Sequence, residues 1–476
     1  MKKLIVIIFI IFGAFLTFSL YRTLAYDTSI VEETPSTTDL EYTFKIGNSI
    51  IKQITVDSGE TKYYDVVLGN PNPAKISYGV YYEMVSPSSK PDGFSIEYTS
   101  KSTGESTGRI DKEGNITLNL VVTNTSSSSV TVKLGTVAGY VNGGELTLES
   151  GQEYITKKSF PKATEFVESL NDNSTGDSGS GVYKVHHDAI SAENSVTGQL
   201  IEDTDDYRYY GSPDNYICLD NSVSPCEDRH LYRIIGSIYE ELEKSYRIKV
   251  IKATKLTDGN SYTWLWDRTS SCSYSNVWAT STNGNYSNSL TSGSQIMKLL
   301  NSGAWWNKMQ GEYYNGYSCY SSDIVKIDFT NYGLSDNAKQ FISLSRYYLG
   351  TTNSYNANTS YVLERGSSSK KYWDGYVGLV YPSDYGYASG VSCSSDISNS
   401  NCEPWISKKS YDSMYYNISS ISPRNESDIW SISYGNIMCK NCDKPDPMVV
   451  YPVFYLSKDV VITSGTGTEQ DPYLVQ

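Results

Sequence analysis

The sequence contains few of the groups that acid–base chemistry at neutral pH uses. Only 3 of its 476 residues are His, and charged residues make up 19%, which is below the roughly 25% of average globular proteins. Positive charge is also scarce, because 39 Lys and Arg face 53 Asp and Glu and leave a formal net charge of −14. Since nucleic-acid backbones repel such a chain, we expect no nucleic-acid partner.

Long apolar runs are absent apart from one, residues 4–20, which follows two lysines. This pattern predicts an export segment over residues 1–26. Thr23 and Ala25 are small residues placed for cleavage after Ala25, whereas the run also reaches the lower limit for crossing a bilayer. A cleaved signal peptide and a retained membrane anchor both stay open. We expect a protein that is secreted or held at the extracellular face of the cell membrane, touching the membrane only through residues 4–20 if they are uncleaved.

Cysteine is missing from the first 200 residues, and the eight cysteines that follow form an even number. In an exported chain this predicts disulfides. Short gaps in the sequence favour three pairs and leave a fourth: Cys218 with Cys226, Cys393 with Cys402, Cys439 with Cys442, and Cys272 with Cys319.

Residues 27–39 are polar and contain a proline, which predicts a stalk. Residues 40–156 contain short runs of alternating apolar and polar residues, separated by turn signals such as Gly143-Gly144. This pattern predicts an all-β, Ig-like sandwich. The segment has neither Cys nor Trp, so we expect a spacer or packing module.

Two strings in this segment carry a resemblance. Residues 66–71 (VVLGNP) and 76–82 (ISYGVYY) resemble the exported β-sandwich fibre proteins of Gram-positive biofilm matrices, the camelysin and TasA type. The resemblance implies subunits that associate strand to strand. A structural matrix or fibre component that self-associates through its β-sandwich is therefore one alternative function.

Residues 157–200 are expected to connect two domains. The apolar residues after Pro161 share one face of a short helix, and the Asn-, Ser- and Gly-rich residues 171–181 predict a flexible linker. His186 and His187 have no third ligand near them in sequence, so we interpret them as exposed linker residues. We expect neither a metal nor a cofactor.

Residues 201–476 differ in composition, because all eight Trp and all eight Cys lie there. Alternation over residues 230–254 predicts a hairpin with its turn at residues 240–244. Ser294 and Ser335 are expected to cap two amphipathic helices. Helices among scattered strands and stapled loops predict a disulfide-stapled α+β domain.

A second resemblance covers most of this domain. Residues 207–220 (YRYYGSPDNYICLD) and 378–389 (GLVYPSDYGYAS) resemble a large family of uncharacterised exported proteins of Gram-positive bacteria. The C-terminal half is similar in pattern to C-type-lectin-like and formylglycine-generating-enzyme-like folds, in which a Trp-Ser-rich stretch precedes a terminal strand. Residues 430–433 (WSIS) and 451–456 (YPVFYL) fill those places. The resemblance implies a C-type-lectin-like fold.

The composition of this domain, rich in Tyr, Ser, Asn and Gly with some Trp, is typical of surfaces that recognise varied partners. Aromatic rings also offer flat apolar faces with polar tips to a sugar. We therefore predict an adhesin-like domain that binds a glycan or an extracellular protein without covalent chemistry. The candidate binding residues lie in loop-like tracts: Tyr317, Tyr355, Tyr361, Trp373, Tyr385, Tyr387 and Trp405. Four other tryptophans are expected in the core: Trp264, Trp266, Trp305 and Trp306.

Catalytic motifs are poorly represented. The domain has one histidine, His230, and no Gly-x-Ser-x-Gly motif, so a serine or cysteine triad lacks support. Cys439 and Cys442 are followed by Pro445, which prevents the helix that reactive CxxC pairs use. Four carboxylates would act as a glycosidase pair only if folding brought two together: Asp323, Asp328, Asp374 and Asp384. We predict no catalytic residue and keep a carbohydrate-active or modifying enzyme as the third alternative.

Overall fold

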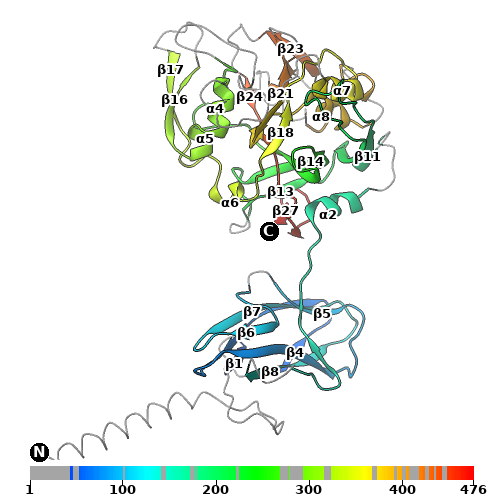
Figure 1. Ribbon diagram of the computed structural model, residues 1–476, viewed down its shortest axis with the longest axis vertical. Helices are drawn as coiled ribbons and strands as arrows, with labels where there is room; N and C mark the ends of the chain where they lie inside the picture. Colours follow the sequence, from blue (N-terminus) through cyan, green and yellow to red (C-terminus); the bar gives the residue numbers. More distant parts are fainter. Residues whose placement is uncertain are drawn as a thin grey trace, which may run out of the picture. The chain divides into compact units, whose positions relative to one another are not determined.

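The computed structural model divides the chain into two compact units, Met1–Ser159 and Phe160–Gln476 (Figure 1). The described residues are 43–46, 53–99, 102–140, 146–171, 176, 179–220, 225–267, 278, 293–315, 323–366, 372–390, 394–398, 404–406, 417–423, 428–433, 436–441 and 448–476. The predicted export segment and stalk lie outside this set. Within it, no helix combines the length and the apolar character that a membrane crossing requires.

The first unit is a β-sandwich, as the alternating pattern predicts. One sheet has the order β1 (Thr43–Ile46), β3 (Glu60–Gly69), β7 (Asn115–Asn124), β5 (Phe94–Tyr98), β10 (Thr156–Lys157). The other has the order β2 (Gln53–Val56), β8 (Val130–Tyr140), β4 (Ile76–Ser86), β6 (Thr107–Ile110), with β9 (Gln152–Tyr154) also paired to β4. Val66 and Leu118 from the first sheet and Val80 and Leu134 from the second belong to one buried cluster.

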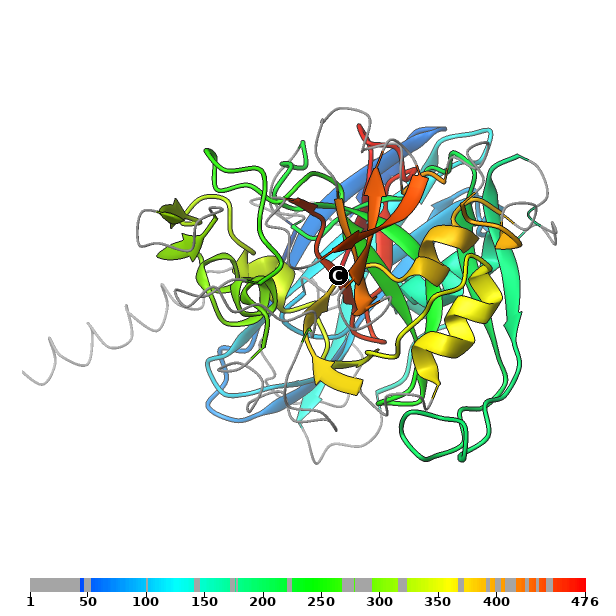
Figure 2. The ribbon, with the colours of Figure 1, turned by 90° about the horizontal axis from the view of Figure 1, so that it is seen from above.

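The second unit is built around a large sheet with the order β20 (Val377–Gly378), β25 (Val453–Tyr455), β15 (Ser245–Lys252), β14 (Leu231–Glu240), β13 (Tyr216–Cys218), β27 (Tyr473–Val475), β26 (Ile462–Ser464). Strand β12 (Thr204–Tyr210) joins it by pairing with β14 and with β11 (Gly181–His187). Figure 2 shows the C-terminal strands, in red, among the green strands from the start of the unit.

Smaller sheets and short helices surround this sheet. The small sheets are β16 (Gln310–Tyr314) with β17 (Ile324–Asp328), β18 (Ser345–Tyr348) with β19 (Tyr372–Gly375), and β23 (Asn436–Asn441), β22 (Asp428–Ser433), β21 (Asn417–Pro423), β24 (Val449–Val450) in that order. The helices are α2 (Ala163–Ser169), α4 (Gln295–Asn301), α5 (Ala304–Asn307), α6 (Asp336–Lys339), α7 (Ala357–Arg365) and α8 (Pro382–Tyr387). In both views α4 and α5 lie on one side of the central strands, and α7 and α8 lie on the other (Figure 1, Figure 2).

The predicted hairpin and helix caps are confirmed. Strands β14 and β15 are antiparallel, and Glu240 pairs with Ser245 across the turn. Ser294 Oγ accepts a hydrogen bond from Met297 N at the start of α4, and Ser335 Oγ accepts one from Ala338 N at the start of α6. These side chains satisfy amide groups that the first helical turn leaves without an intrahelical partner.

Much of the segment 157–200 belongs to the second unit, while residues 172–175, 177 and 178 of the predicted flexible linker lie outside the described residues. Helix α2 buries Ala163 and Val167 in the core of the second unit, and residues 181–187 form strand β11 paired along its length with β12. Buried and exposed side chains alternate along the second half of β11, but its lysine and two histidines hide this pattern in the sequence. The second unit therefore begins at Phe160 instead of residue 201.

Candidate functional site

Most of the predicted ligand-binding aromatics are in the core, so the prediction that they form an exposed surface is wrong. Helices and strands replace the expected loops: Tyr361 is on α7, Trp373 on β19, and Tyr385 and Tyr387 on α8. The buried ones are Tyr361, Trp373, Tyr385, Tyr387 and Trp405. Tyr355 is partly buried, with its ring edge-on to Trp430 at 5.4 Å between centroids. Tyr317 lies outside the described residues.

The buried rings surround charged groups, which explains why a Tyr-rich segment folds inward. The ring of Tyr361 stacks on His187 with 3.6 Å between centroids, and the Arg365 guanidinium lies 3.5 Å from the centroid of the same ring. Arg208 lies 4.8 Å from the ring centroid of Tyr387. Aromatic faces attract cations, so these tyrosines pack against charges that a purely aliphatic core would not accept.

Arg208 links two buried carboxylates in this region. Its Nη2 lies 2.7 Å from Asp206 Oδ2, and its Nη1 lies 2.8 Å from Asp384 Oδ1. Lys249 Nζ lies 2.5 Å from the other oxygen of Asp384. Burial by itself would raise the pKa of Asp384, but the Lys249 and Arg208 cations outweigh it and lower the pKa to about 2. The two cations balance the two anions inside the core.

The expectation that His187 is an exposed linker residue is also wrong. Its side chain is buried, and its Nε2 lies 3.0 Å from Asp206 Oδ2. Burial lowers the pKa of His187, although Asp206 favours the charged ring. The neighbouring His186 is exposed, as predicted, and its Nδ1 lies 2.9 Å from Asp205 Oδ1.

Two of the carboxylates considered for catalysis are held by cations in separate places. Asp384 belongs to the network with Lys249, and Asp374 receives two hydrogen bonds from the Arg346 guanidinium at 2.8 and 3.0 Å. Such paired geometry is typical of structural ion pairs. In the part of the chain that the structure describes, His, Cys, Asp and Glu side chains form no group of three suited to a metal ion.

A polar pocket of about 250 Å³ lies elsewhere in the second unit. Its walls come from the residues after β13, the residues before β14, the end of α5, and the turn that leads into α6. Side chains of both charges line it: Asp220, Asp336, Arg229, Lys308, His230 and Ser335. This is the candidate functional site, because it is a concave surface that collects polar groups from distant parts of the chain.

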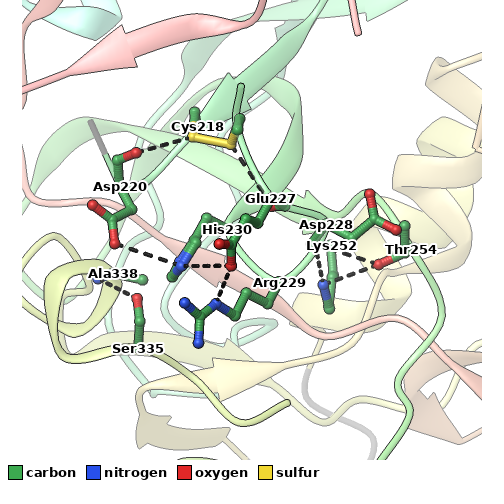
Figure 3. Close-up of a disulfide and its surroundings, with 11 residues drawn as sticks. Cys218, Asp220, Glu227, Asp228, Arg229, His230, Lys252, Thr254, Ser335 and Ala338 are labelled. Atoms are coloured by element: carbon green, nitrogen blue, oxygen red, sulfur yellow. Dashed lines mark hydrogen bonds and ion pairs between the residues drawn. A yellow bond between two sulfur atoms is a disulfide. The ribbon is translucent and has the colours of Figure 1, made fainter. Parts of the chain in front are cut away.

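A disulfide shapes one wall of the pocket. Cys218 and Cys226 are bonded, as predicted, and they close the loop that carries Asp220 (Figure 3). Another part of the lining needs a glycine, because a Cβ atom on Gly333 would lie 2.7 Å from the carbonyl oxygen of Trp305. The tight turn at Gly333 therefore brings Ser335 and α6 beside the end of α5.

His230, which lines the pocket, lies between two carboxylates (Figure 3). Its Nε2 lies 3.5 Å from Asp220 Oδ2 and 4.0 Å from Glu227 Oε2. Only 1% of its side chain is exposed, and neither ring nitrogen has a hydrogen-bond partner in the described structure. Burial lowers the pKa of His230 although Asp220 pulls it upward, so burial favours the neutral ring, which has one donor and one acceptor nitrogen.

The two cations of the pocket are each steadied on one side. Glu227 Oε2 lies 2.6 Å from Arg229 Nε (Figure 3). Asp336 Oδ2 lies 2.5 Å from Lys308 Nζ. Arg229 and Lys308 remain partly exposed, with side-chain exposures of 40% and 33%. Both therefore offer donors to a molecule that enters the pocket.

The comparisons with known proteins leave the site to be interpreted from its chemistry. No family model matches the chain, and no curated protein is significantly similar to it.

The remaining predicted disulfides fall outside what can be described. Cys439 is on β23, and its side chain lies outside the described set, as do Cys272, Cys319, Cys393, Cys402 and Cys442.

The sequence did not predict the pocket, because His230 was considered only as part of a catalytic triad. The available signals were the predicted Cys218 to Cys226 pair, which encloses Asp220, and the predicted Ser335 cap.

Proposed function

We propose that the protein is an exported surface protein whose second unit binds a neutral sugar without covalent chemistry. The observation that carries this proposal is the balanced polar lining of the pocket. Asp220 and Asp336 accept hydrogen bonds, Arg229 and Lys308 donate them, and Ser335 does both. Each sugar hydroxyl is a donor and an acceptor, so a lining with both capacities matches it better than a lining of one charge.

The charges of the pocket favour a neutral ligand over an ionic one. Two carboxylates and two cations line it, and burial, which lowers the pKa of His230, favours the uncharged form of that ring. An anion entering the pocket would gain from Arg229 and Lys308 but meet Asp220 and Asp336. Hydrogen bonds to charged side chains are stronger than those between neutral groups. A neutral polyhydroxyl ligand would form such hydrogen bonds without adding a net charge to the pocket.

The size of the pocket limits what enters it. A volume of about 250 Å³ is just below the roughly 300–1,000 Å³ of drug-sized sites. We therefore assign the pocket to one sugar ring of a glycan. This keeps the predicted glycan recognition but moves it from the buried aromatics to a polar site.

We also propose a more specific fold class for each unit and an extracellular location for the protein. We assign the sandwich to the Ig-like class and the second unit to the C-type-lectin-like class, supported by the terminal strand that follows residues 430–433 and enters the main sheet. The Cys218–Cys226 disulfide supports export, because such bonds persist in oxidising compartments. Protease added to intact cells that produce the full-length chain is expected to degrade both units. Protection of both units would contradict export.

Binding is tested with the full-length protein on immobilised glucose, galactose, mannose and N-acetylglucosamine and on their oligomers. We expect selective binding to at least one neutral sugar, and a loss of roughly tenfold or more for Asp220→Asn and for the exposed Asp336→Asn. Asp459→Asn, which removes an exposed carboxylate paired with Lys162, is the matched control and should bind as the wild type does. Binding to none of these sugars, or equal binding by the pocket variants, would overturn the proposal.

A further inference from the structure

An exposed tyrosine lies in the turn that forms one wall of the pocket. Thr330 and Gly333 both line the pocket, and Tyr332 stands between them with 44% of its surface exposed. Tyr332 N and Gly333 N both donate hydrogen bonds to Phe329 O, at 3.3 and 2.8 Å. These two hydrogen bonds to one carbonyl oxygen make the turn tight and fix the backbone of Tyr332 between two residues that line the pocket.

The ring of Tyr332 is supported from one side by a second loop. A Cβ atom built on Gly259 would lie 2.7 to 2.8 Å from two ring carbons and the hydroxyl oxygen of Tyr332, so the ring lies directly against the glycine backbone. Gly259 has φ +90°, a conformation that other residues rarely adopt. The ring is thus seated on a surface without a side chain, and part of it still faces solvent.

The two loops are tied together by Asp258. Its Oδ1 accepts hydrogen bonds from Asn260 N and Ser261 N at 3.0 and 2.6 Å. Its Oδ2 accepts one from Asp328 N at 3.4 Å. Tyr262, in the same loop as Gly259, is 46% exposed, and Lys255 Nζ lies 4.5 Å from its ring centroid. The loops therefore present two exposed tyrosines, of which Tyr332 lies in the turn that lines the pocket.

We propose that Tyr332 is the aromatic platform for a second sugar ring, next to the ring that occupies the pocket, so that the ligand is an oligosaccharide and not a single sugar. This inference rests on the proposed function. The pocket volume suits one ring, and Tyr332 belongs to the turn whose Thr330 and Gly333 line that pocket. Sugar rings have an apolar face of C–H groups, and a supported aromatic ring offers a flat partner for it at small entropic cost.

The experiment compares affinity against oligomer length in the full-length protein. The probes are glucose, galactose, mannose and N-acetylglucosamine, each as monomer, dimer and tetramer. We expect the dimer of the recognised sugar to bind about tenfold more tightly than its monomer. Tyr332→Ala should remove this gain while leaving the affinity for the monomer unchanged, and Tyr332→Phe should retain the gain. Tyr63→Ala, an exposed tyrosine of the sandwich unit, is the matched control and should behave as the wild type.

The outcomes separate this inference from the function on which it rests. Equal binding of monomer and dimer by the wild type, or a gain retained by Tyr332→Ala, would overturn the role of Tyr332 while leaving sugar binding intact. A wild-type protein that binds none of the probes would overturn the proposed function and this inference together. Thermal unfolding of each variant checks that it is folded. Because Tyr332 is at the surface, we expect the Tyr332 variants to unfold at the same temperature as the wild type.

Discussion

Lys249 and Asp384 form an ion pair with 2.5 Å between Nζ and Oδ2, and only 1% of each side chain is exposed. Tyr381 and Tyr455 enclose the ammonium group, with ring centroids 4.4 and 5.4 Å away. A pair so buried stabilises the fold only while both members are present, since either one alone is an uncompensated charge in a medium of low polarity.

We expect Lys249→Met to lower the free energy of unfolding of the second unit by about 3–5 kcal/mol, because it leaves Asp384 buried with only Arg208 as a cationic partner. Tryptophan fluorescence during urea denaturation measures this unit alone, since every Trp lies beyond residue 200. The control is Lys162→Met, which removes an exposed partner of Asp459 and should cost less than about 1 kcal/mol. Equal effects of the two variants would contradict the role of burial.

Trp373→Ala tests whether that residue is core or binding surface. Its side chain is completely buried, 5.6 Å from the ring centroid of Tyr347. Removing a large buried ring costs about 3–5 kcal/mol, and we expect a loss of this size in urea denaturation. Sugar affinity of the folded fraction should not change. A stable variant that has lost sugar binding would show that Trp373 belongs to the ligand-binding surface.

Stability should depend on pH through His187. Burial lowers the pKa of His187 below 6.5 in the folded state, so the unfolded chain takes up a proton at higher pH than the folded chain does. The stability that neutral His187 contributes is therefore present above pH 6.5 and is lost as the pH falls through the lower, folded value. We expect the stability difference between the wild type and His187→Gln to shrink between about pH 7 and about pH 5 in urea denaturation.

A second group titrates in the same range with the opposite sign. Burial raises the pKa of Glu364 to about 7, so the stability that Glu364 contributes is lost as the pH rises. This contribution is the same in the wild type and in His187→Gln, so it cancels from their difference. His186→Gln is the control, because hydrogen bonding to Asp205 raises the pKa of exposed His186, and its contribution therefore fades as the pH rises. The same trend for both histidine variants would contradict the assignment.

Removal of the Cys218–Cys226 disulfide should affect stability and binding together. The bond joins residues with a sequence separation of 8. In the chain-entropy account, removing a disulfide that closes so short a loop lowers the free energy of unfolding by roughly 2–3 kcal/mol. We expect the double variant Cys218→Ser, Cys226→Ser to unfold at lower urea concentration and to bind sugar more weakly, because Asp220 lies inside the loop. Unchanged affinity in the folded double variant would show that the loop does not position Asp220.

Local patterns predicted local structure well. Alternation placed β14 and β15, and the hydroxyls of Ser294 and Ser335 marked two helix starts, because each signal is contained in a few adjacent residues. Helix α8 was missed because its sequence, PSDYGY, has the composition of a loop. It is a helix because Pro382 is accepted in the first turn and Asp384 accepts a hydrogen bond from Tyr381 N.

The site was harder to predict than the fold. Asp220, Arg229, Lys308 and Ser335 come from three separate parts of the chain, and no spacing in the sequence relates them. The same holds for the buried network, where Lys249 meets Asp384 across 135 positions. A Tyr-rich composition suits an exposed surface and equally suits a core that contains cations, and only the fold separates the two.

The order of strands in the second unit also determines when it is able to fold. Strand β13 lies between β14 and β27, with Cys218 in register with Leu474. Residues 473–475 thus complete a sheet whose first strands lie near the start of the second unit. Such distant pairings form slowly, and these must wait until residues 473–475 have left the ribosome. Until then β13 keeps an open edge, which neighbouring nascent chains are able to pair with.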